Sequence, residues 1–146
     1  MRNASKDSFV IEANGAIDAA SNAISLHNVG QLTFGNNSND FKTYYTTLEN
    51  GTKQLTGYCF TLNYLVDNGV YSLKKNKIDD SEYGGYVVAQ KVLNANKYTS
   101  TFTYKLSFRN KDFYVKDYTE AAVKADDVKE SSGGKNGIET KCPDGI

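Results

Sequence analysis

Few side chains in this sequence could carry chemistry. Two cysteines, Cys59 and Cys142, and a single histidine, His27, are too few to complete a structural zinc site. A cysteine–histidine nucleophile pair would need a residue that orients the histidine, and no acidic side chain stands near His27 in the sequence. We therefore expect a disulfide between the cysteines, which would imply an oxidising, extracytoplasmic setting. The alternative is two buried free thiols.

Acidic residues gather in two short stretches, at residues 79–82 and 126–130. Paired carboxylates can transfer protons or bind calcium, but neither stretch has the spacing of a calcium loop. Both lie in polar surroundings, so we expect solvated surface. The chain also has no nucleophile-elbow, phosphate-loop or metalloprotease motif. The sequence predicts no catalytic residue, no cofactor and no metal ligand, and hence a protein that is not an enzyme.

Composition narrows the class of protein. The chain has 146 residues, 39% of them hydrophobic, and a formal net charge of zero. This length is sufficient for one domain with a real core. A neutral chain gives no electrostatic sign of a nucleic-acid site. No apolar run is long enough to span a membrane, and the start of the chain is too polar for a secretory signal. Either the protein is cytosolic, or a leader and an anchor lie upstream of Met1.

The longest predicted element is a helix over residues 1–27. Apolar residues recur there at steps of three and four, which places them on one helical face. A helix with such a stripe must bury it, and we expect it to pack on a sheet through Val10, Ala13, Ile17, Ala20 and Ile24. Ala16 and Ala23 add small residues beside this face. Gly15 lowers the intrinsic stability of the helix by about 1 kcal/mol relative to alanine.

Residues 28–85 are predicted to be loop and short helix. We expect a loop with at most a short strand at residues 31–34, and an irregular stretch at 41–55 with a helical turn at 44–48. The Asn50-Gly51 pair signals a turn. A short helix is predicted over residues 58–69, ended by Asn68-Gly69. Residues 70–78 are predicted to form an exposed basic segment.

Residues 86–118 are predicted to form an antiparallel meander of three strands, at 86–92, 98–108 and 113–118. Residues 98–108 alternate between aromatic or aliphatic and polar side chains, which predicts one buried and one solvated face. The C-terminal region, 119–146, has a possible short helix at 119–128 and a loop at 129–136. The expected fold class is therefore α+β, with a long N-terminal helix covering an antiparallel sheet in a single domain.

Two stretches resemble a known family. The first, RNASKDSFVIEANGAIDAASNAISL, is similar to the segment that follows the membrane-spanning half-helix of type IV pilins and pseudopilins. The second, CFTLNYLVDNGVY…YGGYVVAQKV…YKLSFRNKDFYV, looks like the pattern of Gram-positive, clostridial-type pilins. The leader, the processing site and the hydrophobic half-helix of that family are absent here. We therefore expect a truncated soluble domain, anchored in the membrane only through the missing segment.

The resemblance implies a pilin fold and a function. The protein would be a subunit of a surface filament for adhesion, motility or DNA uptake, assembled by packing N-terminal helices. Its partners would be other pilin subunits and surface ligands. Ala16 and Ala23 would face neighbouring helices, and the Cys59–Cys142 disulfide would close the C-terminal region. The alternatives are a pseudopilin of a secretion or DNA-uptake system and a surface module that binds a ligand through its tyrosines.

Overall fold

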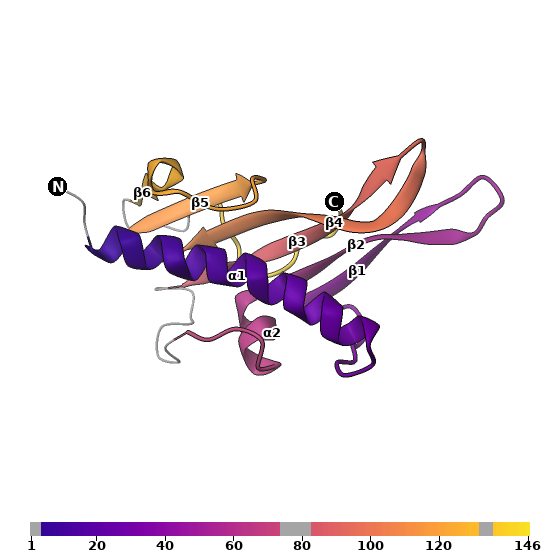
Figure 1. Ribbon diagram of the computed structural model, residues 1–146, viewed down its shortest axis with the longest axis horizontal. Coiled ribbons are helices and arrows are strands. Elements are labelled where there is room, and N and C mark those ends of the chain that lie inside the picture. Colours follow the sequence, from indigo (N-terminus) through magenta and orange to yellow (C-terminus); the bar gives the residue numbers. More distant parts are fainter. Residues whose placement is uncertain (1–3, 74–82, 132–135) are drawn as a thin grey trace.

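The computed structural model describes residues 4–73, 83–131 and 136–146. Its elements, in chain order, are α1 (Ala4–Asn28), β1 (Phe41–Thr47), β2 (Lys53–Thr61), α2 (Leu62–Asp67), β3 (Gly84–Asn94), β4 (Lys97–Arg109), β5 (Phe113–Tyr118), the short 3₁₀ helix η2 (Ala125–Asp127) and β6 (Lys129–Glu130). The strands form one antiparallel sheet of six, ordered as in the chain. Helix α1 crosses one face of this sheet (Figure 1). The predicted α+β class with a long N-terminal helix is confirmed.

The first hairpin corrects the prediction for residues 41–55. This stretch is not irregular, because it forms β1 and the start of β2 around the Asn50-Gly51 turn, where Gly51 has φ 84°. Phenylalanine, tyrosine and threonine favour a strand here. The buried residues of β1 are Phe41 and Tyr44, three positions apart, so the two-residue period that would have revealed the strand is missing. The register shift between Tyr44 and Tyr45 leaves Thr56 of β2 as an extra residue. Residues 31–34 form no strand, which agrees with the predicted loop.

Helix α2 is shorter than the predicted helix over 58–69. Residues 58–61 belong to β2, and the helix begins where the Thr61 hydroxyl accepts a hydrogen bond from the Tyr64 N–H at 3.2 Å. The predicted end is correct: Asn68 caps the helix and Gly69 has φ 75°. The segment predicted to be exposed at 70–78 is partly buried where it is described, because Val70, Tyr71 and Leu73 pack against the core. Its lysines, from residue 74 onward, lie outside the described residues.

Strand β3 begins earlier than predicted. The two glycines expected to break the chain, Gly84 and Gly85, are instead its first residues. Gly85 has φ 130°, and a Cβ there would overlap the carbonyl oxygen of Ser107 on β4. Glycine is thus required for close backbone pairing. The predicted turn at 94–96 is present, with positive φ at Ala95 and Asn96, and β5 has the predicted bounds.

The expected helix over 119–128 is wrong, and only the three-residue η2 forms. Side chains compete with helical hydrogen bonding in this segment. The Asp127 carboxylate accepts from the Lys124 N–H at 3.2 Å, and the Tyr118 hydroxyl lies 2.6 Å from the Ala122 carbonyl oxygen. The stretch predicted as loop after residue 128 also contains the short strand β6, which pairs with β5.

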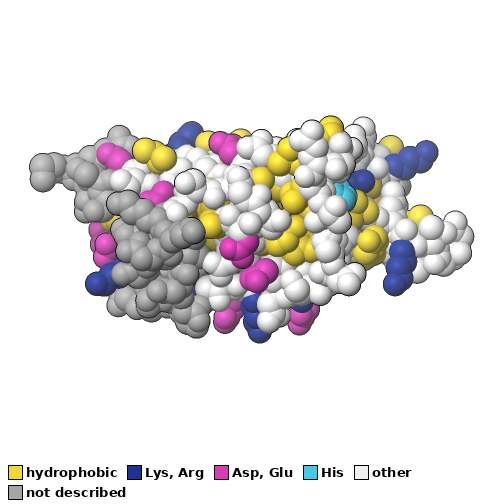
Figure 2. Space-filling model, turned by 90° about the horizontal axis from the view of Figure 1, so that it is seen from below, with side chains coloured by type: hydrophobic (Ala, Val, Ile, Leu, Met, Phe, Trp, Pro, Cys, Tyr) yellow, Lys and Arg dark blue, Asp and Glu magenta, His cyan; other side chains and the backbone are white. Residues whose placement is uncertain are grey.

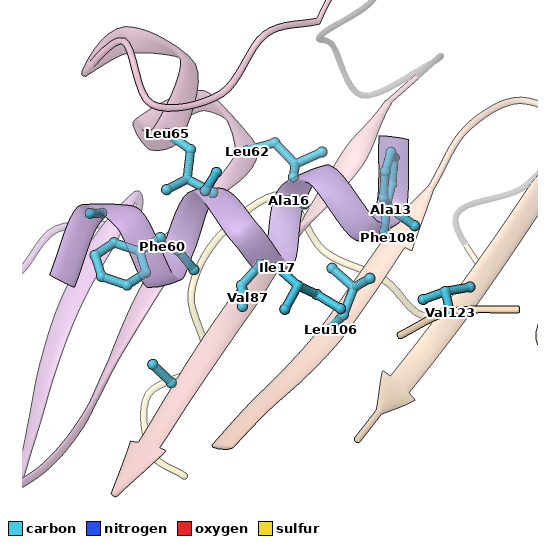
Figure 3. Close-up of a cluster of buried hydrophobic side chains, with 14 of the residues drawn as sticks. Ala13, Ala16, Ile17, Phe60, Leu62, Leu65, Val87, Leu106, Phe108 and Val123 are labelled. Atoms are coloured by element: carbon cyan, nitrogen blue, oxygen red, sulfur yellow. The ribbon is translucent and has the colours of Figure 1, made fainter. Parts of the chain in front are cut away.

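The main core lies between α1 and the sheet (Figure 3). Ile17 points into it together with Val87 and Leu106 of neighbouring strands, and Phe60 and Phe108 complete its floor. The helix buries residues Phe9, Ala13, Ala16, Ile17, Ala19, Ala20, Ala23 and Ile24. Val10, which was predicted to face the sheet, is only partly buried. Phe9 occupies the inward position instead.

The opposite face of the sheet is not uniformly solvated, which corrects a second expectation. Residues 138–146, here named the C-terminal strap, contact this face, and Cys59, Val88 and Cys142 form a second buried cluster with Tyr44. Arg109 is 2% exposed there, and its Nε–H donates to the carbonyl oxygen of Ile138 at 3.2 Å. The alternation in β4 predicted this face to be polar but gave no sign that it is covered.

Candidate functional site

The two cysteines form a disulfide. The Cα atoms of Cys59 and Cys142 are 5.9 Å apart, and both residues are buried. The bond joins β2 to the C-terminal strap, across 83 positions of sequence. Restricting the unfolded chain in this way contributes about 4.5 kcal/mol to stability. The predicted disulfide is confirmed and the free-thiol alternative is wrong, so neither cysteine has a thiol to act as a nucleophile.

Three polar contacts fix the strap beside β1. The Cys142 N–H donates to the Asn39 carbonyl at 2.8 Å, and the Tyr44 hydroxyl donates to the Pro143 carbonyl at 2.5 Å. Lys42 forms an ion pair with Asp144 at 2.9 Å. This hydrogen bond and charge lower the pKa of the Asp144 carboxyl, whereas burial raises the pKa of Tyr44 to about 12.

The contacts of His27 are with its own domain. Its ring stacks on Phe34 with centroids 4.0 Å apart, and Nδ1–H donates to the Leu32 carbonyl at 3.0 Å. The histidine therefore folds the loop after α1 back onto the helix end. Figure 2 shows His27 beside hydrophobic side chains on this face of the molecule.

The acidic residues form no metal site in the described chain. Residues 79–82 lie outside it, and no group of three potential ligands comes together in the rest. Asp127 instead accepts a hydrogen bond from the Tyr118 hydroxyl at 2.9 Å. Desolvation, together with Asp127, raises the pKa of Tyr118 to about 12. This carboxylate organises the loop around η2.

The candidate subunit contacts on α1 need correction. Ala16 and Ala23 are both 0% exposed and pack inside the domain, so they present no surface to a neighbouring helix. The spacing of apolar residues at steps of three and four shows which residues share a helical face, but not what that face contacts. A face packed on the sheet and a face packed on another molecule would both be apolar and composed of small residues.

A different stripe of α1 faces outward. Before its last residue, Asn28, the exposed residues of the helix follow steps of three, four and seven: Ser8, Ile11, Asp18, Asn22 and Ser25. We name these five residues the α1 outer stripe. Ile11 is 72% exposed, although isoleucine is usually buried. Sequence reasoning missed this position because Ile11 lies outside the apolar periodicity.

Beside the outer stripe, Gly15 provides space for an aromatic ring. A Cβ at Gly15 would lie 3.2 Å from Cε1 of Tyr71, whose hydroxyl donates to the Glu12 carbonyl at 2.5 Å. Burial raises the pKa of Tyr71 strongly, with Glu12 as the next cause. The glycine, unfavourable in an isolated helix, thus lets the segment after α2 cross α1 closely.

None of the described helices is both long and apolar enough to cross a membrane. Compared with known proteins, the chain matches no protein-family model, no curated protein and no solved structure.

Proposed function

We propose that this protein is a structural subunit of a type IV pilus, a surface filament used for adhesion, motility or DNA uptake. The observation that carries the proposal is the placement of α1. One side of this helix packs along the sheet, and the other presents the α1 outer stripe to solvent. Such a helix can serve its own domain and a neighbour at once.

The ends of the molecule are also consistent with assembly. Figure 1 places the start of α1 at one end of the molecule and the turns of the β1–β2 and β3–β4 hairpins at the other. A helical segment before α1 could therefore continue away from the sheet without displacing it. The proposal places such an apolar segment upstream and assigns α1 of other subunits as its partners. The disulfide supports a location outside the cytosol.

Labelling of whole cells tests this proposal. Antibodies raised against residues 4–146 should label thin filaments along their length in electron micrographs of cells that produce the native protein. Labelling of the envelope without extended filaments would favour the pseudopilin alternative and contradict a pilus subunit.

A pair of substitutions tests the role of α1. Ile11→Asp places a charge on the α1 outer stripe and should remove filaments while leaving the melting temperature of the isolated domain unchanged. Thr101→Asp introduces the same charge at an exposed position of β4 and should leave filaments intact. Normal filaments with Ile11→Asp would exclude the outer stripe as a subunit contact.

A second candidate function is a surface module that binds a ligand. It is favoured by the tyrosines of the sheet, because Tyr44, Tyr45 and Tyr98 line the same groove.

A further inference from the structure

The groove lies on the strap side of the sheet and has a volume of about 380 Å³. Thr56 of β2 and Gln90 of β3 contribute to its lining, as do tyrosines of β1 and β4. Ile146 of the strap lines it as well, and a Cβ added at Gly57 would stand 2.9 Å from Cδ1 of Ile146. The volume falls within the range of about 300–1,000 Å³ for small-molecule sites.

The polar groups in this groove have unused hydrogen-bonding capacity. Within the described chain no hydrogen bond joins the Thr56 hydroxyl or the side chains of Gln90 and Tyr98 to another protein group. Solvent reaches all three along the groove, so a ligand group or water can bind them. Hydroxyl and amide groups can both donate and accept.

The charge balance of the groove narrows the ligand class. Among the side chains that line it, the only charged one is Asp144, which is paired with Lys42 at 2.9 Å. The lining side chains therefore provide no cation for a phosphate or sulfate and no free acidic pair for a metal ion. What it does provide is aromatic surface beside groups that both donate and accept hydrogen bonds. A pyranose ring has the complementary character, with apolar C–H faces and a rim of hydroxyls.

We propose that this groove binds an uncharged saccharide, with Tyr98 and Tyr45 offering ring surface and Thr56 and Gln90 hydrogen bonds to sugar hydroxyls. The proposal does not depend on filament assembly. It gives the disulfide a second role, because the bond holds the strap that completes one side of the groove.

An NMR titration of the disulfide-bonded protein tests the proposal. The probes are maltose, cellobiose, lactose and N,N′-diacetylchitobiose at millimolar concentration, with sialyllactose and an uncharged extended peptide as comparison ligands. At least one neutral saccharide should shift the backbone signals of Thr56, Gln90 and Gly145 in a saturable way. Shifts elsewhere only, no shifts with any neutral sugar, or shifts with the peptide alone would overturn it.

Three variants locate the site. Tyr98→Ala should weaken saccharide binding about tenfold through loss of ring contact. Gln90→Ala, at an exposed position, should weaken it about threefold without affecting folding. Thr101→Ala, on β4 but outside the groove, should change affinity less than about twofold. Melting curves establish that each variant is folded. Equal affinity for all three variants and the unchanged protein would overturn the assignment.

Discussion

Asn14 binds both backbone groups of Val123, which is 109 positions away in sequence. Its side-chain amide donates to the Val123 carbonyl at 3.0 Å, and its carbonyl oxygen accepts from the Val123 N–H at 2.6 Å. The side chain therefore replaces a strand partner and attaches the loop after β5 to α1. Val123 is buried, so neither backbone group is readily solvated if Asn14 is lost.

Asn14→Ala should lower the free energy of unfolding by about 1–3 kcal/mol, since it leaves a buried donor and acceptor unpaired. Urea denaturation measures this change. Asn14→Asp should be intermediate, because a carboxylate can accept from the N–H but repels the carbonyl. Asn22→Ala, on the exposed side of the same helix, should change stability by less than about 0.5 kcal/mol.

The buried alanines of α1 should not tolerate larger side chains. Ala16→Leu should destabilise the isolated domain by about 1–3 kcal/mol through overpacking. Asp18→Leu adds comparable apolar bulk on the outer stripe and should have little effect on unfolding. If Ala16→Leu were as stable as the unchanged protein, the helix would not pack as described.

Ile17→Ala removes a side chain from the centre of the core. The expected loss is about 2–5 kcal/mol, the sum of lost burial and the cavity that remains. Thermal and urea unfolding should both show Ile17→Ala to be less stable than the unchanged protein. A loss below about 1 kcal/mol would indicate that the sheet collapses onto the helix without penalty.

Removing the disulfide should destabilise the domain and release the strap. The paired replacement Cys59→Ala with Cys142→Ala should cost about 2–5 kcal/mol. Hydrogen exchange should then accelerate at the backbone N–H of position 142, which in the unchanged protein donates to the Asn39 carbonyl. Intact mass without reductant reports the bond directly, and two free thiols in protein matured outside the cytosol would contradict it.

High pH should destabilise the strap through Tyr44. Burial raises the pKa of this phenol from 10.0 to about 12. The neutral hydroxyl therefore stabilises the folded state below pH 10, and this contribution is lost as the pH rises from about 10 towards 12. Unfolding midpoints should fall over this interval, and less steeply in Tyr44→Phe, which cannot ionise. An identical slope in both proteins would show that other tyrosines dominate.

How far the sequence predicts this fold depends on the kind of signal. The regular alternation in β4 and the spacing of Ala13, Ile17 and Ala20 were sufficient to predict a helix over a sheet, because period alone distinguishes these elements. Strand β1 lacks that period because it buries Phe41 and Tyr44, three positions apart, in the two different clusters on opposite faces of the sheet. The first hairpin was therefore missed.

The candidate sites were less predictable because they depend on contacts between distant segments. Ala16 and Ala23 are as small as residues at a helix–helix contact, and only the observed packing shows that they are buried in the domain itself. Thr56 and Gln90 are 34 positions apart and become groove neighbours only through sheet pairing and the strap. No local pattern marks either residue.

The bond between Cys59 and Cys142 has a mechanical consequence. A pulling force applied at the two ends of the chain would pass directly from β2 to the strap through the sulfur atoms. The intervening chain, residues 60–141, which includes β3, β4 and β5, would carry no tension. At 3.3–3.6 Å per residue this segment would extend by about 280 Å if the bond were absent. Only α1, β1 and most of β2 would unfold under the load, so the fully extended length would be that of residues 1–59 and 142–146 alone.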